Sequence, residues 1–135
     1  MSTREKERYE KLQELLAKLS DEAAKVCLVL VEGKKDAHAL AELGICGHIL
    51  AVKAGGKSSF DVLQQIEAMH PSEVILLLDY DRRGQECTRW FQRELERLKI
   101  KVNVRFWIEL HALAGHEVQC IEGLPAYLVT LQQKT

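Results

Sequence analysis

The sequence predicts a three-layer α/β protein, with a sheet of about four largely parallel strands flanked by helices and with extra helices at both ends. Two apolar runs, 26–31 and 74–78, are rich in Val, Ile and Leu and lack polar alternation. Such runs are typical of strands buried on both faces. Segments of helical periodicity follow each run, and strands joined through helices form parallel sheets by right-handed crossovers.

The expected elements alternate along the chain. Helical spacing of leucines predicts a first helix that stops where Ser20-Asp21 breaks the pattern. Gly44 suits the end of the second helix, and the third runs from Ser58 or Ser59 until Pro71. The other expected boundaries are helices 3–19, 35–43, 84–98, 109–114 and 125–132 and strands 25–31, 48–52, 73–78 and 102–107. The mixed pattern of the last strand suits a sheet edge.

Composition sets further bounds. The 135 residues suit one domain, 1–135. The chain has no apolar run long enough to span a membrane, and its charged N-terminus lacks the apolar stretch of a signal peptide, so we expect a cytoplasmic protein. The net charge of −1 means that nucleic-acid binding would need a local basic patch. The four cysteines lack C-x-x-C spacing, so we expect reduced thiols and no zinc site.

Acidic residues follow both apolar runs. Glu32-Gly33 ends the first, and Asp79 and Asp81 follow the second, with Gly84 soon after. The carboxyl ends of parallel strands converge on one edge, so the three carboxylates should meet there, where Mg²⁺ would offset their repulsion. A polar turn explains Glu32 taken alone, and helix capping explains one aspartate but not both. Gly84 permits a tight turn or a close approach to a phosphate.

A glycine-rich turn lies between the second strand and the third helix. The segment 51–58 ends in Gly-Lys-Ser and is similar to a phosphate-binding P-loop, but Ala51 replaces the first glycine of that motif. A turn with a serine cap is therefore the preferred interpretation. Gly55, Gly56 and Lys57 still offer amide groups and a charge to a phosphate at the same edge.

The two acidic segments together, 29–37 and 77–84, resemble the Toprim domain of topoisomerases, bacterial-type primases, recombination-repair nucleases and the maturase of 5S ribosomal RNA. The whole chain is most similar to the small stand-alone Toprim proteins of archaea. The resemblance implies a Rossmann-like Toprim core over 25–107, preceded by a helix in 1–20 and followed by a helical extension, 108–135. Topoisomerases often carry a further acid where this chain has Arg83, so the resemblance does not imply a fully acidic two-metal cluster.

Residue roles follow from that resemblance. It implies that Glu32 is a general acid or base or a metal ligand, and that Asp79 and Asp81 coordinate Mg²⁺, for which Mn²⁺ can substitute. Basic residues would contact substrate phosphates at the same edge. These are Lys34, Lys35, Lys53, Lys57, Arg82 and Arg83.

The expected function is Mg²⁺-dependent phosphoryl transfer on nucleic acid, as an RNA or DNA nuclease or as the catalytic part of an RNA-processing complex. A non-catalytic module that binds metal and phosphate in an RNA–protein assembly is the main alternative. A nucleotide-binding phosphotransferase that uses the 51–58 turn is a third. The amphipathic terminal helices also permit a homodimer. The sequence does not choose between RNA and DNA.

Overall fold

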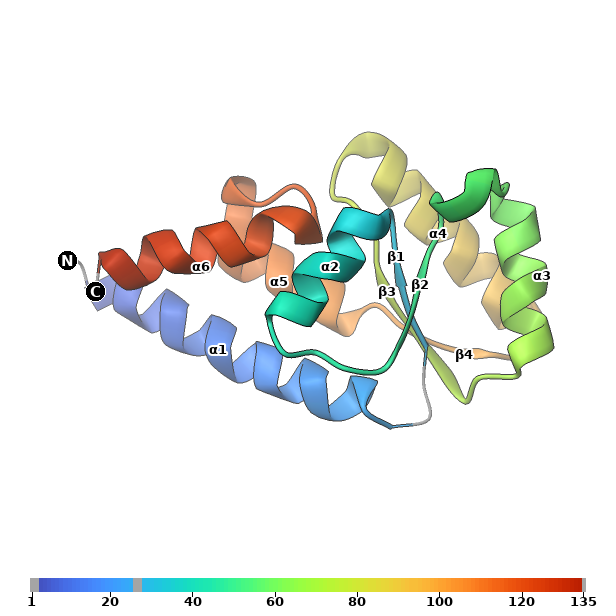
Figure 1. Ribbon diagram of the computed structural model, residues 1–135, viewed down its shortest axis with the longest axis horizontal. Coiled ribbons are helices and arrows are strands. Elements are labelled where there is room, and N and C mark those ends of the chain that lie inside the picture. Colours follow the sequence, from blue (N-terminus) through green and yellow to red (C-terminus); the bar gives the residue numbers. More distant parts are fainter. Residues whose placement is uncertain (1–2, 26–27, 135) are drawn as a thin grey trace.

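Four parallel strands form the centre of the molecule, in the order β2-β1-β3-β4 (Figure 1). The computed structural model describes residues 3–25 and 28–134. The strands are β1 (Leu28–Val31), β2 (His48–Ala51), β3 (Glu73–Leu77) and β4 (Lys101–Asn103). This arrangement confirms the predicted parallel sheet, and β4 lies at an edge as expected.

Helices cover both faces of the sheet. One face packs against α1, α2, α5 and α6, and the other against α3 and α4 (Figure 1). The helices are α1 (Thr3–Ala23), α2 (Lys34–Glu42), α3 (Ser59–Met69), α4 (Arg82–Arg97), α5 (Arg105–Ala114) and α6 (Leu124–Gln133). Short 3₁₀ turns occur at η1 (Ala54–Gly56), η2 (Gly115–Glu117) and η3 (Ile121–Gly123). The three-layer prediction is therefore confirmed.

The central strands are buried on both faces because their side chains alternate between two apolar cores. Val29 and Val31 of β1 lie in the core beneath α1, α2, α5 and α6, whereas Leu28 and Leu30 lie in the core beneath α3 and α4. All four side chains are almost completely buried. An uninterrupted apolar run is the sequence that two-sided burial requires.

The terminal helices pack on each other rather than standing apart. Leu12, Leu16 and Leu19 of α1 are buried in the same core as Leu128 and Leu131 of α6. Figure 1 shows α1 and α6 side by side, with both chain ends at one end of the molecule. No helix in the described ranges is long and apolar enough to cross a lipid bilayer.

Two predicted boundaries are wrong. The first helix continues through Ser20-Asp21 to Ala23, because Ala23 lies one turn after Leu19 and is buried with it. The residues expected to end the fourth strand, 105–107, instead begin α5. The Asn103 Oδ1 atom accepts a hydrogen bond from the Arg105 N–H at 2.9 Å, which ends the strand and turns the chain into the helix. Val26 and Cys27, expected in the first strand, lie outside the described residues.

Candidate functional site

The predicted acidic residues lie at one edge of the sheet. Val31 of β1 pairs with Leu77 of β3, so the residues that follow these two strands leave the sheet next to each other. The N-terminal ends of α2, α3 and α4 lie at the same edge (Figure 1). Backbone N–H groups and the positive ends of three helix dipoles therefore lie at the edge of the sheet that holds Glu32 and Asp79.

Asp79 occupies the centre of this edge. Its side chain is partly buried, and its Oδ1 atom is enclosed without a hydrogen-bond partner. Burial, followed by the nearby charges of Glu32, Asp36 and Asp81, raises the pKa of Asp79 from 3.8 to about 7, and Lys53 opposes the shift. The charges of Glu32 and Asp81 thus act on Asp79, as expected from the sequence, but in the described residues the ligand atoms of these three carboxylates do not all lie within 4.8 Å of one another.

Glu32 is 8% exposed, which makes it one of the few buried charged residues of the described chain. The Lys53 Nζ atom lies 3.6 Å from Oε1 of Glu32, whereas Oε2 is buried without a hydrogen-bond partner. The Lys53 N–H also donates to the Glu32 carbonyl oxygen at 2.9 Å. Glu32 therefore has one oxygen beside a cation and one that no protein donor reaches.

Asp81 caps a helix. This exposed residue is the N-cap of α4, and its Oδ1 atom accepts a hydrogen bond from the Gly84 N–H at 2.7 Å. Helix capping, considered from the sequence as the reason for one aspartate, thus accounts for Asp81. It does not account for the acidic side chain at Asp79. Gly84 is buried in the first turn of α4, where an added Cβ would overlap the backbone of Asp79.

Tyr80, between the two aspartates, belongs to the core. Its hydroxyl donates to the Trp107 carbonyl oxygen at 2.6 Å, and its ring stacks on Trp107 with 5.1 Å between centroids. The Trp107 Nε1–H group donates in turn to the Leu78 carbonyl oxygen at 2.7 Å. These contacts hold α5 against the end of β3. Tyr80 is not a nucleophile at this edge.

Two residues of the site were missed from the sequence, Asp36 and Cys120. Asp36 is 6% exposed, and its carboxylate accepts hydrogen bonds from the Gly33 N–H at 3.0 Å and the Glu122 N–H at 2.9 Å. A carboxylate oxygen of Asp36, a carboxylate oxygen of Asp79 and the sulfur of Cys120 all lie within 4.8 Å of one another. Burial is the main cause that raises the pKa of the Cys120 thiol. The one signal in the sequence was that Asp36 follows Glu32 within the first acidic segment.

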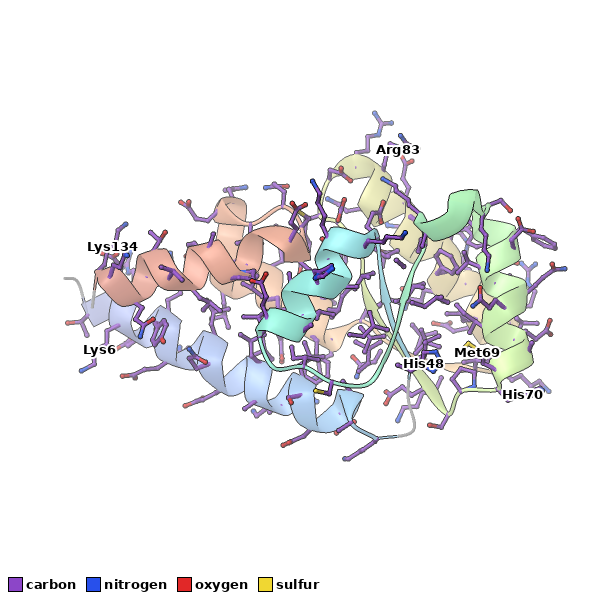
Figure 2. The ribbon with its side chains drawn as sticks, in the orientation of Figure 1. Lys6, His48, Met69, His70, Arg83 and Lys134 are labelled. Carbon is purple, nitrogen blue, oxygen red and sulfur yellow. The ribbon has the colours of Figure 1, made fainter. Side chains whose placement is uncertain are left out.

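The predicted phosphate-binding cations surround the edge and are exposed. Lys34 and Lys35 lie in the first turn of α2, and Arg82 and Arg83 in the first turn of α4. Figure 2 shows Arg83 at this end of the sheet, with His48, Met69 and His70 at the opposite end. Ion pairing differs among them: the Arg82 Nε atom lies 3.3 Å from Glu86, and in the described part of the chain no ion pair holds the two lysines or Arg83.

The glycine-rich turn does not form a P-loop. Gly55 and Gly56, both within the 3₁₀ turn η1, adopt positive φ values of 74° and 67°. The Ser58 hydroxyl caps α3 by accepting a hydrogen bond from the Asp61 N–H at 3.2 Å. The Lys57 Nζ atom donates to Gln65 at 2.9 Å, so it extends along α3. The serine-capped turn preferred from the sequence is therefore what the chain forms here. Gly33, in contrast, has an extended backbone and precedes α2.

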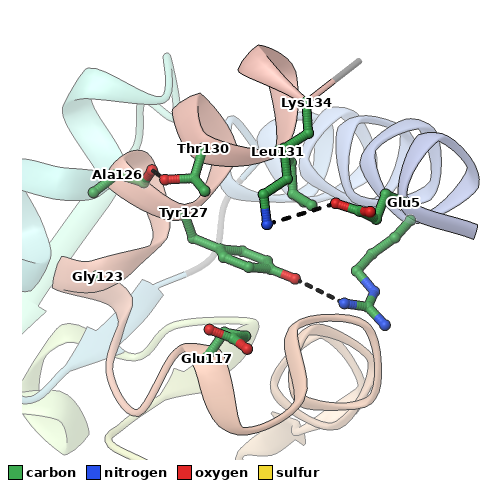
Figure 3. A pocket seen from close by; sticks show the side chains of 9 residues that line it. Glu5, Glu117, Gly123, Ala126, Tyr127, Thr130, Leu131 and Lys134 are labelled. Carbon is green, nitrogen blue, oxygen red and sulfur yellow. Dashed lines mark hydrogen bonds and ion pairs between the residues drawn. The ribbon is translucent and has the colours of Figure 1, made fainter. Parts of the chain in front are cut away.

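A pocket of about 430 Å³ lies away from these carboxylates, between α1 and α6 (Figure 3). The Arg8 Nη1 atom donates to the Tyr127 hydroxyl at 3.1 Å, and the Lys134 Nζ atom lies 3.7 Å from Glu5. Arg8 and Lys134 thus have partners within the pocket lining, and no polar side chain that lines the pocket is fully buried.

Asp79→Asn should make the metal-free protein more stable, and by a larger margin at pH 8 than at pH 5. The folded protein holds the Asp79 proton more tightly than the unfolded chain does, because its pKa is raised to about 7. Below pH 3.8 the Asp79 carboxyl is protonated in both the folded and the unfolded chain and costs no stability. As pH rises from there through about 7, its charge lowers the free energy of unfolding, a loss that asparagine avoids. Thermal unfolding in EDTA at both pH values measures the difference. Asp21→Asn, an exposed change at the end of α1, is the control; an equal gain for Asp79→Asn at both pH values would contradict the assignment.

Comparisons with known proteins place this edge in context. The model of the Toprim domain matches residues 27–108. A UPF0292 protein of Methanosarcina acetivorans is 31% identical over 131 residues, which cover 96% of this chain and 88% of the relative. A UPF0292 protein of Methanocaldococcus jannaschii is 30% identical over 125 residues, or 93% and 95% of the two chains. A solved structure of a protein from Aquifex aeolicus has a TM-score of 0.68 and 28% identity, covering 82% of this chain and 95% of that one.

Proposed function

Since the chain belongs to the Toprim domain family, we propose that it is a Mg²⁺-dependent nuclease that cleaves RNA or DNA, alone or within a processing complex. Membership supports a metal-dependent, nucleic-acid-related function. One observation supports the proposal in this chain: Glu32 Oε2 and Asp79 Oδ1 are buried carboxylate oxygens without a hydrogen-bond partner. An unsatisfied buried carboxylate is costly, and a cation that binds both oxygens would remove that cost.

The donor set suits Mg²⁺. Glu32, Asp79 and Asp81 offer only carboxylate oxygens, the ligands preferred by Mg²⁺ and also accepted by Mn²⁺. When bound, the ion would neutralise charge on the phosphate that is attacked. The second oxygen of Asp81 remains for a metal, because only its Oδ1 atom accepts the capping hydrogen bond.

Glu32 is the proposed general acid or base in the state in which its Oε2 atom faces the substrate rather than the metal. It is enclosed, so it meets the substrate in a setting from which most water is excluded, and its Oε2 atom has no protein donor to displace. A carboxylate in this position can take a proton from the attacking water or return one to the leaving oxygen. Lys53, beside Oε1, holds the side chain at the edge of the sheet.

Phosphate contacts would come from the exposed cations on three sides. Lys34 and Lys35 would approach from α2, Arg82 and Arg83 from α4, and Lys57 from the turn before α3 once it leaves Gln65. The helix N-termini at the same edge add backbone N–H donors. A local basic rim of this kind supports nucleic-acid binding even though the net charge is −1.

The metal assignment makes a direct prediction. Asp79→Asn and Asp81→Asn should each weaken Mg²⁺ or Mn²⁺ binding without unfolding the protein. Asparagine is as good an N-cap as aspartate, so Asp81→Asn keeps the start of α4. Calorimetric titration measures the affinities, with Asp21→Asn as the control. An unchanged affinity in the double variant would remove Asp79 and Asp81 from the site.

The function is tested by incubating the purified protein with labelled single-stranded and double-stranded RNA and DNA, in Mg²⁺, in Mn²⁺ and in EDTA. We expect cleavage of at least one substrate that depends on the metal. Binding without any cleavage, under every metal condition, would favour the non-catalytic module instead.

A further inference from the structure

We propose that Cys120, Asp36 and Asp79 bind a thiophilic divalent cation of the Zn²⁺ class, at a site that differs in its ligands from the all-oxygen site proposed for Mg²⁺. The three ligand atoms lie within 4.8 Å of one another. They come from three segments: the first turn of α2, the residues after β3, and the connection between η2 and η3. The inference does not depend on nuclease activity, although both sites use Asp79.

The backbone holds these three side chains together. The Tyr80 N–H donates to the Gln119 carbonyl oxygen at 2.7 Å, which fixes the segment before η3 beside the end of β3. The Glu122 N–H donates to Asp36 Oδ1 at 2.9 Å, and the Gly33 N–H donates to Asp36 Oδ2 at 3.0 Å. Cys120 lies between these two attachments, so its sulfur is held beside both aspartates. The site is therefore built by the packing of the C-terminal extension on the sheet.

Buried carboxylate oxygens without hydrogen-bond partners indicate that a ligand binds at this edge of the sheet. Asp79 Oδ1 is enclosed and has no hydrogen-bond partner. Glu32, 8% exposed, acts on Asp79 through its charge, and its Oε2 atom also lacks a partner. Of the charges that act on Asp79, three are carboxylates, Glu32, Asp36 and Asp81, and one is a cation, Lys53. A divalent cation would balance this excess of negative charge.

The thiol decides which class of cation fits. Mg²⁺ avoids sulfur, whereas Zn²⁺ accepts one cysteine sulfur together with carboxylate oxygens. Ligands of one tetrahedral zinc ion lie about 3.3 to 3.5 Å apart, so movements of roughly 1 Å from the present positions suffice. Each Asp36 oxygen accepts one backbone hydrogen bond and keeps a lone pair for the metal. On binding, the Cys120 S–H bond breaks, the proton passes to solvent and the thiolate binds the ion.

Co²⁺ is the probe for this site, because a thiolate bound to Co²⁺ gives a charge-transfer absorption band in the near ultraviolet. The full-length protein, reduced and freed of metal with EDTA, is titrated with Co²⁺. We expect the band in the wild type and its loss in Cys120→Ser, with an affinity for Co²⁺ lower by about 10- to 100-fold or more. Cys46→Ser and Cys87→Ser, the other described cysteines, are matched controls that should keep the band.

Two outcomes would overturn the inference: no band in the wild type at saturating Co²⁺, or an undiminished band in Cys120→Ser. A measurement without substitution covers the case in which that variant does not fold. Zn²⁺ should protect Cys120, but not the exposed Cys46, from alkylation of the wild-type protein, as mass spectrometry of the labelled peptides reports. Equal labelling of Cys120 with and without Zn²⁺ would contradict the site.

Asp81→Asn separates this site from the proposed Mg²⁺ site. Asp81 is not among the three ligands, so this variant should keep the cobalt band while its Mg²⁺ affinity falls. A protein that shows the band but cleaves no nucleic acid would refute the nuclease alone. Cleavage in Mg²⁺ without a cobalt band would refute the thiolate site alone.

Discussion

Glu32→Gln should lower nucleic-acid cleavage by about 10²- to 10⁴-fold, the range that general acid–base catalysis contributes. Glutamine keeps the shape of the side chain but cannot transfer the proton. Its amide also removes one negative charge from the edge, so substrate should bind as tightly as before or more tightly. Cleavage rates at saturating substrate, with affinities from fluorescence anisotropy in EDTA, measure the two effects separately.

Glu67→Gln is the matched control, because it makes the same chemical change at an exposed position on α3. It should cleave and bind like the wild type. If the protein is only a binding module, the wild type cleaves nothing and Glu32→Gln changes affinity alone. Cleavage that persists undiminished in a rigorously purified Glu32→Gln preparation would show that Glu32 is not the proton-transferring residue.

Gly84→Ala should destabilise the fold by about 1 to 3 kcal/mol, the usual cost of overpacking. Helix propensity alone predicts the opposite sign, since alanine is favoured over glycine by about 1 kcal/mol inside a helix. The close contact with the segment just before α4 decides here, because a Cβ at Gly84 would overlap the Asp79 backbone and only a backbone shift can relieve it. Urea denaturation gives the free energy of unfolding. The same shift moves Asp79, so Mg²⁺ affinity should also fall.

Gly123→Ala provides the comparison. Gly123 has φ −80°, and a Cβ there would meet only Val118 Cγ1, at 3.9 Å. This substitution should leave the free energy of unfolding almost unchanged. If Gly84→Ala proved as stable as the wild type, α4 would not pack as closely on the segment after β3 as the structure shows.

The order of strands and helices could be predicted from the sequence because each element has a local signature. The runs that became β1 and β3 are apolar without alternation, since both of their faces are covered. Their parallel pairing then places Glu32 and Asp79 at one edge, which needs only the rule that parallel strands end together. The fourth strand was predicted too long, because an apolar segment such as Phe106-Trp107 fits a strand or a buried helix equally well.

The composition of the site beyond those two carboxylates was decided by tertiary structure. Asp36 accepts a hydrogen bond from Glu122, 86 positions away in sequence, and this contact brings Cys120 beside Asp79. No spacing rule can show a cluster whose groups come from three separate segments, so the cysteine pattern could not indicate that Cys120 lies beside Asp36 and Asp79. The sequence by itself placed Glu32, Asp79 and Asp81 at this edge, through the pairing of the strands that precede them. Packing of the C-terminal extension decided which of their oxygens are enclosed and what lies next to them, because burial and hydrogen bonding depend on contacts between distant segments.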